Sequence, residues 1–183
     1  MRSKILSFSL ILSLFIVFAS ITASGSNRYF LPFDIQYYSL SKPTQRQVDC
    51  LAQNIYHEAG HESQEGKVAV AMVTLNRLAS GNYANDVCGV VKQKTNGTCQ
   101  FSWYCAVTGL TIRDVSLYND IRNLAVNVLM NYDNMNDITG GATYYHADYV
   151  NPQWGLPKTT QIGRHIFYKR NTDTQTMKKE IKI

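Results

Sequence analysis

The first clear hydrophobic pattern in the chain begins at Thr44 and has the period of an α-helix. Gln47 stands three residues after Thr44, so the two form a capping box that opens the helix, and Gly60 is its expected end. The apolar positions recur every three or four residues: Val48, Leu51, Ala52, Ile55 and Ala59. The pattern therefore predicts an amphipathic helix that buries one stripe.

Two longer helices and one short helix are expected farther along. After Ser63, the run "KVAVAMVTLNRL" is apolar nearly all round until Gly81, which is typical of a central buried helix. The run "DVCGVVKQK" predicts a short helix, and residues 95–109 predict a loop because they hold glycines and polar residues. An amphipathic helix is expected from about Ser116 to Tyr132.

The last part of the domain has a different pattern, with aromatic residues, turn residues and two β-like runs. It reads "GATYYHADYVNPQWGLPKTTQIGRHIFYKR". Together with the helices before it, this segment predicts a mostly helical α+β fold.

A chain of 183 residues with 45% hydrophobic content has room for one core, so one folded domain is expected, over residues 44–170. Residues 1–25 have the pattern of a signal peptide, in which Arg2 and Lys4 precede an apolar run and small residues follow it. That run is short for a bilayer span, so we expect a secreted or periplasmic protein with no stable membrane insertion after cleavage. Residues 26–43 are expected to form a linker or N-terminal arm, and residues 171–183 a polar tail.

Charge and cysteine content add two constraints. The net charge of +5 falls to +3 without Arg2 and Lys4, an excess that favours an anionic partner such as a cell-wall polymer but also fits an ordinary basic surface. No basic run interleaved with aromatic residues points to nucleic acid. Four cysteines in an exported chain favour two disulfides, with three pairings open: Cys50, Cys88, Cys99 and Cys105.

The most distinctive local motif is "HEAGH", which has the H-E-x-x-H spacing of zinc proteases. On a helix, His57 and His61 would lie one turn apart and bind zinc, while Glu58 activates a water molecule. A helical wheel places both histidines away from the apolar stripe, facing water, with Glu58 at its border. The usual metzincin extension is missing, because Gln64 and Lys67 occupy its positions, although a third ligand remains available from His146, Asp148 and His165.

Glu58 has a second interpretation, as a general acid. A carboxyl group at the edge of an apolar stripe and near a helix end is partly desolvated, which raises its pKa towards the working pH. Protonation of a glycosidic oxygen requires such a group. A solvated glutamate without a chemical role is the ordinary alternative.

Several blocks, in order over roughly residues 48–169, resemble the SleB/CwlJ cell wall hydrolases, which are known from spore-cortex lysis. They are "CLAQNIYHEAGHESQEGKVAVAMVTLNRL", "VCGVV", "CQFSW", "GATYYHADYVNPQW" and "QIGRHIFY". The resemblance implies a lysozyme-like single domain that cleaves the peptidoglycan glycan strand, as several members do by lytic transglycosylation. The family's first block is close to Y-x-E-A-R-G-E, so it implies Glu58 as the catalytic acid and Glu62 as a second acid. Gly60 and His61 depart from that block.

The resemblance and the chemistry of glycan cleavage together give a set of expected site residues. A lytic transglycosylase needs one carboxyl group, Glu58, whereas a two-carboxylate glycosidase would take Asp148 as its partner. We expect the substrate to be bound by Glu62, Gln100, Ser102, Tyr145 and His146. Tyr144 and Trp154 are expected in the opposite wall of the groove, and His165 in a structural hydrogen bond.

The remaining expectations concern disulfides, cofactors and partners. We favour Cys99 with Cys105, because a short closed loop beside "QFSW" gains rigidity, and hence Cys50 with Cys88. No metal or other cofactor is expected, and the partner is peptidoglycan, bound by a monomer without nucleic acid. Two alternatives stay open: a secreted zinc metalloprotease and a non-catalytic peptidoglycan-binding protein.

Overall fold

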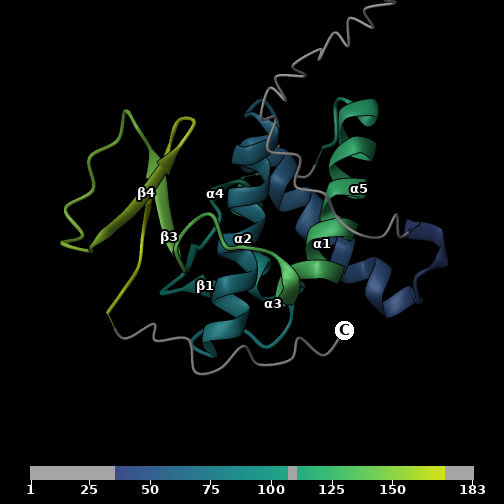
Figure 1. The fold of residues 1–183 in the computed structure, drawn as a ribbon, viewed down its shortest axis with the longest axis horizontal. Helices are drawn as coiled ribbons and strands as arrows, with labels where there is room; N and C mark the ends of the chain where they lie inside the picture. The colour runs from purple at the N-terminus through teal and green to yellow at the C-terminus, as the bar shows by residue number, and fades with distance from the viewer. Residues whose placement is uncertain (1–35, 107–110, 172–183) are drawn as a thin grey trace, which may run out of the picture. The chain divides into compact units, whose positions relative to one another are not determined.

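The structure, a computed structural model, describes residues 36–106 and 111–171, all of which belong to one compact unit (Figure 1). The expected signal peptide (1–25), most of the linker and nearly all of the tail lie outside these residues. In the two ranges that the structure describes, no helix has the length and apolar character needed to cross a membrane. The elements are η1 (Tyr37–Ser39), α1 (Lys42–Ala59), α2 (Gln64–Ser80), α3 (Val87–Lys92), β1 (Lys94–Thr95), β2 (Thr98–Cys99), α4 (Ser102–Cys105), α5 (Val115–Asn131), η2 (Tyr132–Asn134), β3 (Tyr144–Ala147), β4 (Lys158–Ile162) and β5 (His165–Tyr168).

Helix α1 begins two residues earlier than the sequence pattern predicts. Its N-cap is Ser41, whose side chain accepts a hydrogen bond from the backbone N–H of Thr44, so the predicted capping box at Thr44 is wrong. Pro43 is tolerated in the first turn because the first N–H groups of a helix have no intrahelical acceptor. The helix ends at Ala59 with Gly60 as its C-cap, as predicted.

Helix α2 is the centre of the fold, and α1, α3 and α5 pack around it. The prediction of a buried helix between Ser63 and Gly81 is confirmed: Ser63 caps its start, and Gly81 ends it in the left-handed conformation at φ 69°. Glycine adopts that conformation without steric cost, which explains a sharp stop at this position.

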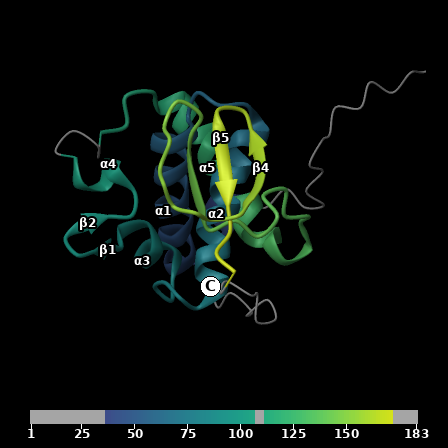
Figure 2. The same ribbon diagram turned by 90° about the vertical axis from the view of Figure 1, so that its left-hand side faces the viewer.

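The last three strands form an antiparallel sheet in the order β3-β5-β4, which lies against α2 (Figure 2). Side chains alternate across a strand, so Tyr145 and Phe167 face inward, and Phe167 packs with Ala69 and Val73 of α2. The mostly helical α+β fold is thus confirmed. The prediction of two strands here was one too few.

The predicted loop over residues 95–109 is also wrong in part, because it contains the β1–β2 hairpin and the one-turn helix α4. Strands of two residues are too short to show a period in sequence. A disulfide joins Cys99 of β2 to Cys105 of α4, and another joins Cys50 of α1 to Cys88 of α3. Both favoured pairings are confirmed, and all four cysteines are paired.

Candidate active site

A polar cavity of about 170 Å³ lies where α1, α2, the β2–α4 segment and β3 meet. Its lining residues are Glu58, Arg77, Cys99, Gln100, Phe101, Ser102 and Tyr145. Four residues singled out from sequence are therefore brought together, although they come from three distant segments. Within residues 36–106 and 111–171, Glu58 is the one residue with a carboxyl group in this lining.

The carboxyl group of Glu58 has an altered acidity because of its surroundings. Burial raises its pKa above the ordinary value, as expected from its place at the edge of the apolar stripe. Two weaker influences act in the opposite direction: a hydrogen bond from Tyr145 and the positive charge of Arg77. Glu58 is thus a carboxylic acid that holds its proton more tightly than a solvated glutamate does, with groups in place that stabilise its anion.

Tyr145 is fixed so that its hydroxyl group reaches Glu58. The Tyr145 hydroxyl donates to Oε2 of Glu58 at 2.9 Å. Its ring makes an edge contact with His165, with ring centroids 5.1 Å apart, and a tilted contact with Phe167 at 5.7 Å. Burial and the nearby Glu58 charge raise the pKa of Tyr145 well above its ordinary value, so the phenol stays protonated and remains a donor.

Arg77 is a residue that the sequence reasoning missed. It is only 5% exposed, and its Nε donates to the carbonyl oxygen of Thr143 at 2.7 Å. Its guanidinium carbon lies 4.9 Å from the centre of the Phe101 ring, while its Nη1 has no hydrogen-bond partner within residues 36–106 and 111–171. An arginine inside the apolar run "KVAVAMVTLNRL" was the available signal, because buried charges are rare unless they are paired or functional.

The segment that contributes Gln100 and Ser102 is anchored to α1 through Trp103. The indole Nε1 of Trp103 donates to Oδ1 of Asn54 at 3.0 Å, and Nδ2 of Asn54 donates to the Thr74 hydroxyl at 3.0 Å. These buried hydrogen bonds connect α4, α1 and α2. The amide of Gln100 is held in turn by a hydrogen bond from its Nε2 to the Thr95 hydroxyl at 2.9 Å.

The two histidines of the "HEAGH" motif have different surroundings. His57 stacks on Trp103 with ring centroids 4.5 Å apart, so the prediction that it faces water is wrong, whereas His61 is exposed as predicted. Burial lowers the pKa of His57, and its Nε2 has no hydrogen-bond partner in the described part of the chain. Nor do the described residues contain a group of three His, Cys, Asp or Glu side chains arranged to hold a metal ion.

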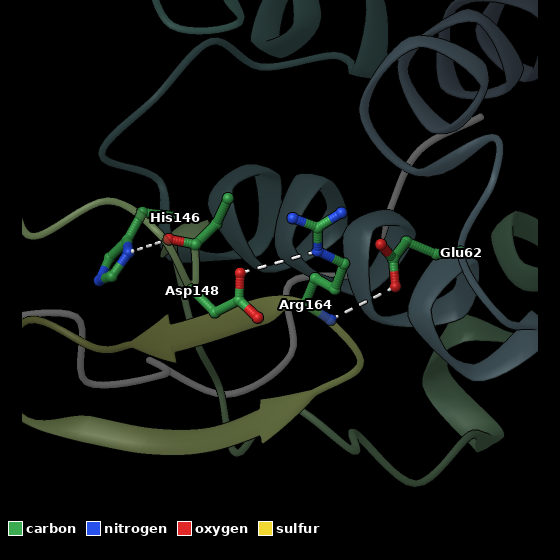
Figure 3. A network of polar contacts seen from close by, with 5 residues as sticks. Glu62, His146, Asp148 and Arg164 are labelled. Carbon is green, nitrogen blue, oxygen red and sulfur yellow. Dashed lines mark hydrogen bonds and ion pairs between the residues drawn. The ribbon is translucent and has the colours of Figure 1, made fainter.

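Glu62, His146 and Asp148 are not among the residues that line the cavity. Figure 3 shows the polar contacts that these residues make instead. Oε2 of Glu62 accepts a hydrogen bond from the backbone N–H of Arg164 at 3.4 Å, and Nε of Arg164 pairs with Asp148 at 3.7 Å. His146 makes one hydrogen bond to the Ala147 carbonyl at 2.8 Å and another to the Tyr168 hydroxyl at 2.9 Å. These three residues belong to the sheet and its contact with the end of α1.

A structural hydrogen bond was predicted for His165, and its Nδ1 does not make one. This nitrogen is buried and finds no hydrogen-bond partner among the residues that the structure describes. Burial is also the main reason that the pKa of His165 is lowered. The ring packs against Tyr145 and Phe167.

Comparison with known proteins gives a family and two solved structures. The model of the family described as Cell Wall Hydrolase matches residues 61–168, a range that begins just after Glu58. The spore cortex-lytic enzyme of Halalkalibacterium halodurans is 32% identical over 127 residues, which are 66% of this chain and 34% of that protein. The spore cortex-lytic enzyme of Bacillus cereus is 30% identical over 129 residues, covering 69% of this chain and 45% of that protein. The chain thus spans less than half the length of these relatives.

The two solved structures are catalytic domains alone. The catalytic domain of the germination-specific lytic transglycosylase SleB from Bacillus anthracis has a TM-score of 0.52 and 30% identity, over 68% of this chain and 95% of that domain. The catalytic domain of SleB from Bacillus cereus gives the same TM-score and identity, with 91% of that domain covered. The similarity to both therefore covers nearly the whole of their length.

Proposed function

The chain belongs to the cell wall hydrolase family, and on this basis we propose that it cleaves the glycan strand of peptidoglycan with Glu58 as its catalytic acid and base. The similarity to the catalytic domain of SleB, a germination-specific lytic transglycosylase, supports cleavage that leaves a 1,6-anhydro-N-acetylmuramic acid end. The proposed compartment is the cell envelope, where this substrate lies.

The observation that supports the proposal most directly is the state of Glu58. Its carboxyl group lies in a polar cavity, burial raises its pKa, and Tyr145 holds one of its oxygens. An acid that delivers a proton near neutral pH needs such a raised pKa, since an ordinary glutamate is already ionised there. Among the residues that the structure describes, none adds a second carboxylate to the cavity lining, which fits a mechanism with a single carboxyl group better than one with two.

In the first proposed step, Glu58 gives its proton to the glycosidic oxygen as the bond from C1 of N-acetylmuramic acid to that oxygen breaks. The carbonyl oxygen of the sugar's own N-acetyl group attacks C1, and an oxazolinium ion forms. Glu58 is then a carboxylate, which is stabilised by the hydrogen bond from Tyr145 and by the charge of Arg77.

In the second proposed step, the Glu58 carboxylate takes the proton of the C6 hydroxyl group. The C6 oxygen attacks C1, the oxazolinium ring opens, and the N-acetyl group is restored. The 1,6-anhydro ring is complete and Glu58 is protonated again, so one residue serves as acid and then as base without a net proton change. Gln100 and Ser102 line the same cavity, and their proposed task is to hold the N-acetyl and hydroxyl groups of the sugar with their amide and hydroxyl groups.

Digestion of purified peptidoglycan followed by borohydride reduction and mass spectrometry tests the proposal. Anhydro ends resist reduction, so the wild-type protein should release unreducible muropeptides, while Glu58→Gln should lower the rate by about 10² to 10⁴. Asp120→Asn, which removes an exposed carboxylate on α5, is the matched control and should remain active. Reducible products would show that the protein hydrolyses the glycan strand instead of forming anhydro ends. Loss of activity with a chelator would favour the zinc protease.

A further inference from the structure

The outward face of the sheet bears a cluster of aromatic side chains. Because side chains alternate along a strand, Tyr144 and His146 of β3 and Tyr168 of β5 point away from the helices. Trp154, from the connection between β3 and β4, lies against all three, with ring centroids 5.9, 5.5 and 5.9 Å away. We call Tyr144, His146, Trp154, Tyr168 and the neighbouring Arg170 the outer aromatic surface.

This surface is not part of the hydrophobic core. Trp154 keeps 44% of its area exposed even though it contacts three rings. Of the five large hydrophobic side chains that are exposed among the described residues, three lie in the same β3–β4 connection: Tyr149, Val150 and Trp154. An exposed cluster of aromatic rings, in contrast to rings scattered singly, commonly marks a binding site.

The charge around the surface is positive. Residues 144–171 contain Lys158, Arg164, Lys169 and Arg170 but only one acid, Asp148, which is already paired with Arg164. The guanidinium group of Arg170 lies 5.2 Å from the centre of the Tyr144 ring, and its Nη2 donates to the Tyr144 hydroxyl. An occupant with apolar sugar faces and nearby carboxylates complements this combination.

The outer aromatic surface lies next to the cavity at Glu58. Tyr144 belongs to the outer surface, and the guanidinium carbon of Arg77, which lines the cavity, lies 6.0 Å from the centre of its ring. The next residue, Tyr145, lines the cavity itself. Strand β3 is at an edge of the sheet, so the path from the cavity to Trp154 crosses this edge without passing over another strand.

We propose that the outer aromatic surface binds sugar residues of the same glycan strand whose scissile bond lies at Glu58, with Trp154 stacked on a sugar ring. Arg170 then faces a carboxylate of the acidic stem peptide attached to that sugar. This inference rests on the proposed function, since it names an extended part of that substrate's binding site. It gives His146 the task of fixing the Tyr168 ring beside Trp154, through the hydrogen bond to the Tyr168 hydroxyl.

Binding to purified cell-wall sacculi, measured by sedimentation in a Glu58→Gln background, separates this surface from catalysis. We expect Trp154→Ala to raise the Kd by about tenfold, because a large aromatic contact is lost. The Kd of Trp154→Phe should stay within about threefold of the value before this substitution, since phenylalanine keeps an apolar ring. The control is Tyr38→Ala, which removes a more exposed ring, at 78%, from η1 on another part of the molecule.

A kinetic experiment completes the test. With Glu58 intact, Trp154→Ala should raise the KM for long glycan strands and leave the rate on a short muropeptide, which fills only the cavity, at the wild-type value. Arg170→Ala should weaken binding to sacculi but not to strands stripped of stem peptides, and the effect should shrink in high salt.

Unchanged binding of Trp154→Ala, or an equal loss on short and long substrates, would overturn the inference. If the wild-type protein binds sacculi through Trp154 and yet cleaves nothing, the surface is real and the proposed function is wrong. The two failures are therefore distinguishable.

Discussion

The hydroxyl group of Tyr145 donates a hydrogen bond to Oε2 of Glu58 at 2.9 Å, across 87 positions of sequence. This contact opposes the effect of burial, because a hydrogen bond to a carboxylate favours the ionised form. Burial thus favours the protonated form of Glu58, while the hydrogen bond from Tyr145 stabilises the carboxylate that remains once the proton has left. Both properties are needed in a residue that acts first as an acid and then as a base.

Replacement of Tyr145 by Phe should move the pH dependence of the reaction. Without the donor, the pKa of Glu58 rises further, so Glu58 stays protonated to a higher pH and the alkaline limb of kcat/KM shifts upward. The rate at the optimum should fall by roughly tenfold to a hundredfold, because this is the rate factor that corresponds to the free energy of a hydrogen bond to a charged group. A pH–rate profile on peptidoglycan measures both effects, and an unmoved alkaline limb would contradict the role given to Tyr145.

Replacement of Glu58 by Gln should stabilise the folded protein at neutral pH while it removes activity. A raised pKa in the folded state means that the native protein binds more protons than the unfolded one, so stability falls as pH rises above the unfolded value of about 4.3. Gln cannot ionise and avoids this loss. Thermal unfolding should show a higher Tm than wild type at pH 7 and a small difference near pH 4.

Asp120→Asn again serves as the control, because it removes an exposed carboxylate on α5. It should leave the pH dependence of Tm close to that of the wild type. An identical Tm for Glu58→Gln and wild type at every pH would show that burial does not penalise the charge of Glu58.

One disulfide should matter more for stability and the other more for activity. Cys50 and Cys88 are 38 positions apart, so loss of their bond by double Ala substitution should cost about 4 kcal/mol in the chain-entropy model. Cys99 and Cys105 are 6 positions apart, which gives about 2 kcal/mol, but their loop contributes to the cavity. Urea unfolding and activity on peptidoglycan should show the greater stability loss in the first pair and the greater activity loss in the second.

The helices could be predicted from sequence because their signals are local. Ser63 and Gly81 directly flank the apolar run of α2, and no distant contact is needed to interpret these signals. The β1–β2 hairpin and α4 were missed since each spans too few residues for a period.

The site was predictable only in part, because its residues acquire their roles from segments that arrive from elsewhere in the chain. Glu58 was found from its place on the stripe, whereas Arg77 has meaning only once β3 lies beside it. The helical wheel predicted that His57 faces solvent, because a wheel of one helix cannot show that Trp103 stacks on that face.

A pair of glycines offers a matched test of the contact between Glu62 and the sheet. Gly163 and Gly155 both have positive φ, at 54° and 61°, but a Cβ on Gly163 would overlap Oε2 of Glu62, whereas one on Gly155 would meet nothing within 4 Å. Gly155→Ala should therefore cost only the backbone strain, about 1–2 kcal/mol. Gly163→Ala should cost up to about 1 kcal/mol more in urea unfolding, because the flexible Glu62 side chain must move away and lose its hydrogen bond from the Arg164 N–H. Equal costs would show that Glu62 moves away freely.

The side-chain amide of Asn76 on α2 ties the segment before the sheet to the helices. Its Nδ2 donates to Asp137, Thr139 and the carbonyl of Ala142, and its Oδ1 accepts from the Tyr132 hydroxyl. The segment that leads into β3 is thus hydrogen-bonded to the most buried helix, and it cannot detach without breaking several hydrogen bonds at once. We therefore expect Glu58 and Tyr145 to separate only when the whole domain unfolds, so that the geometry of the proposed site lasts as long as the fold itself.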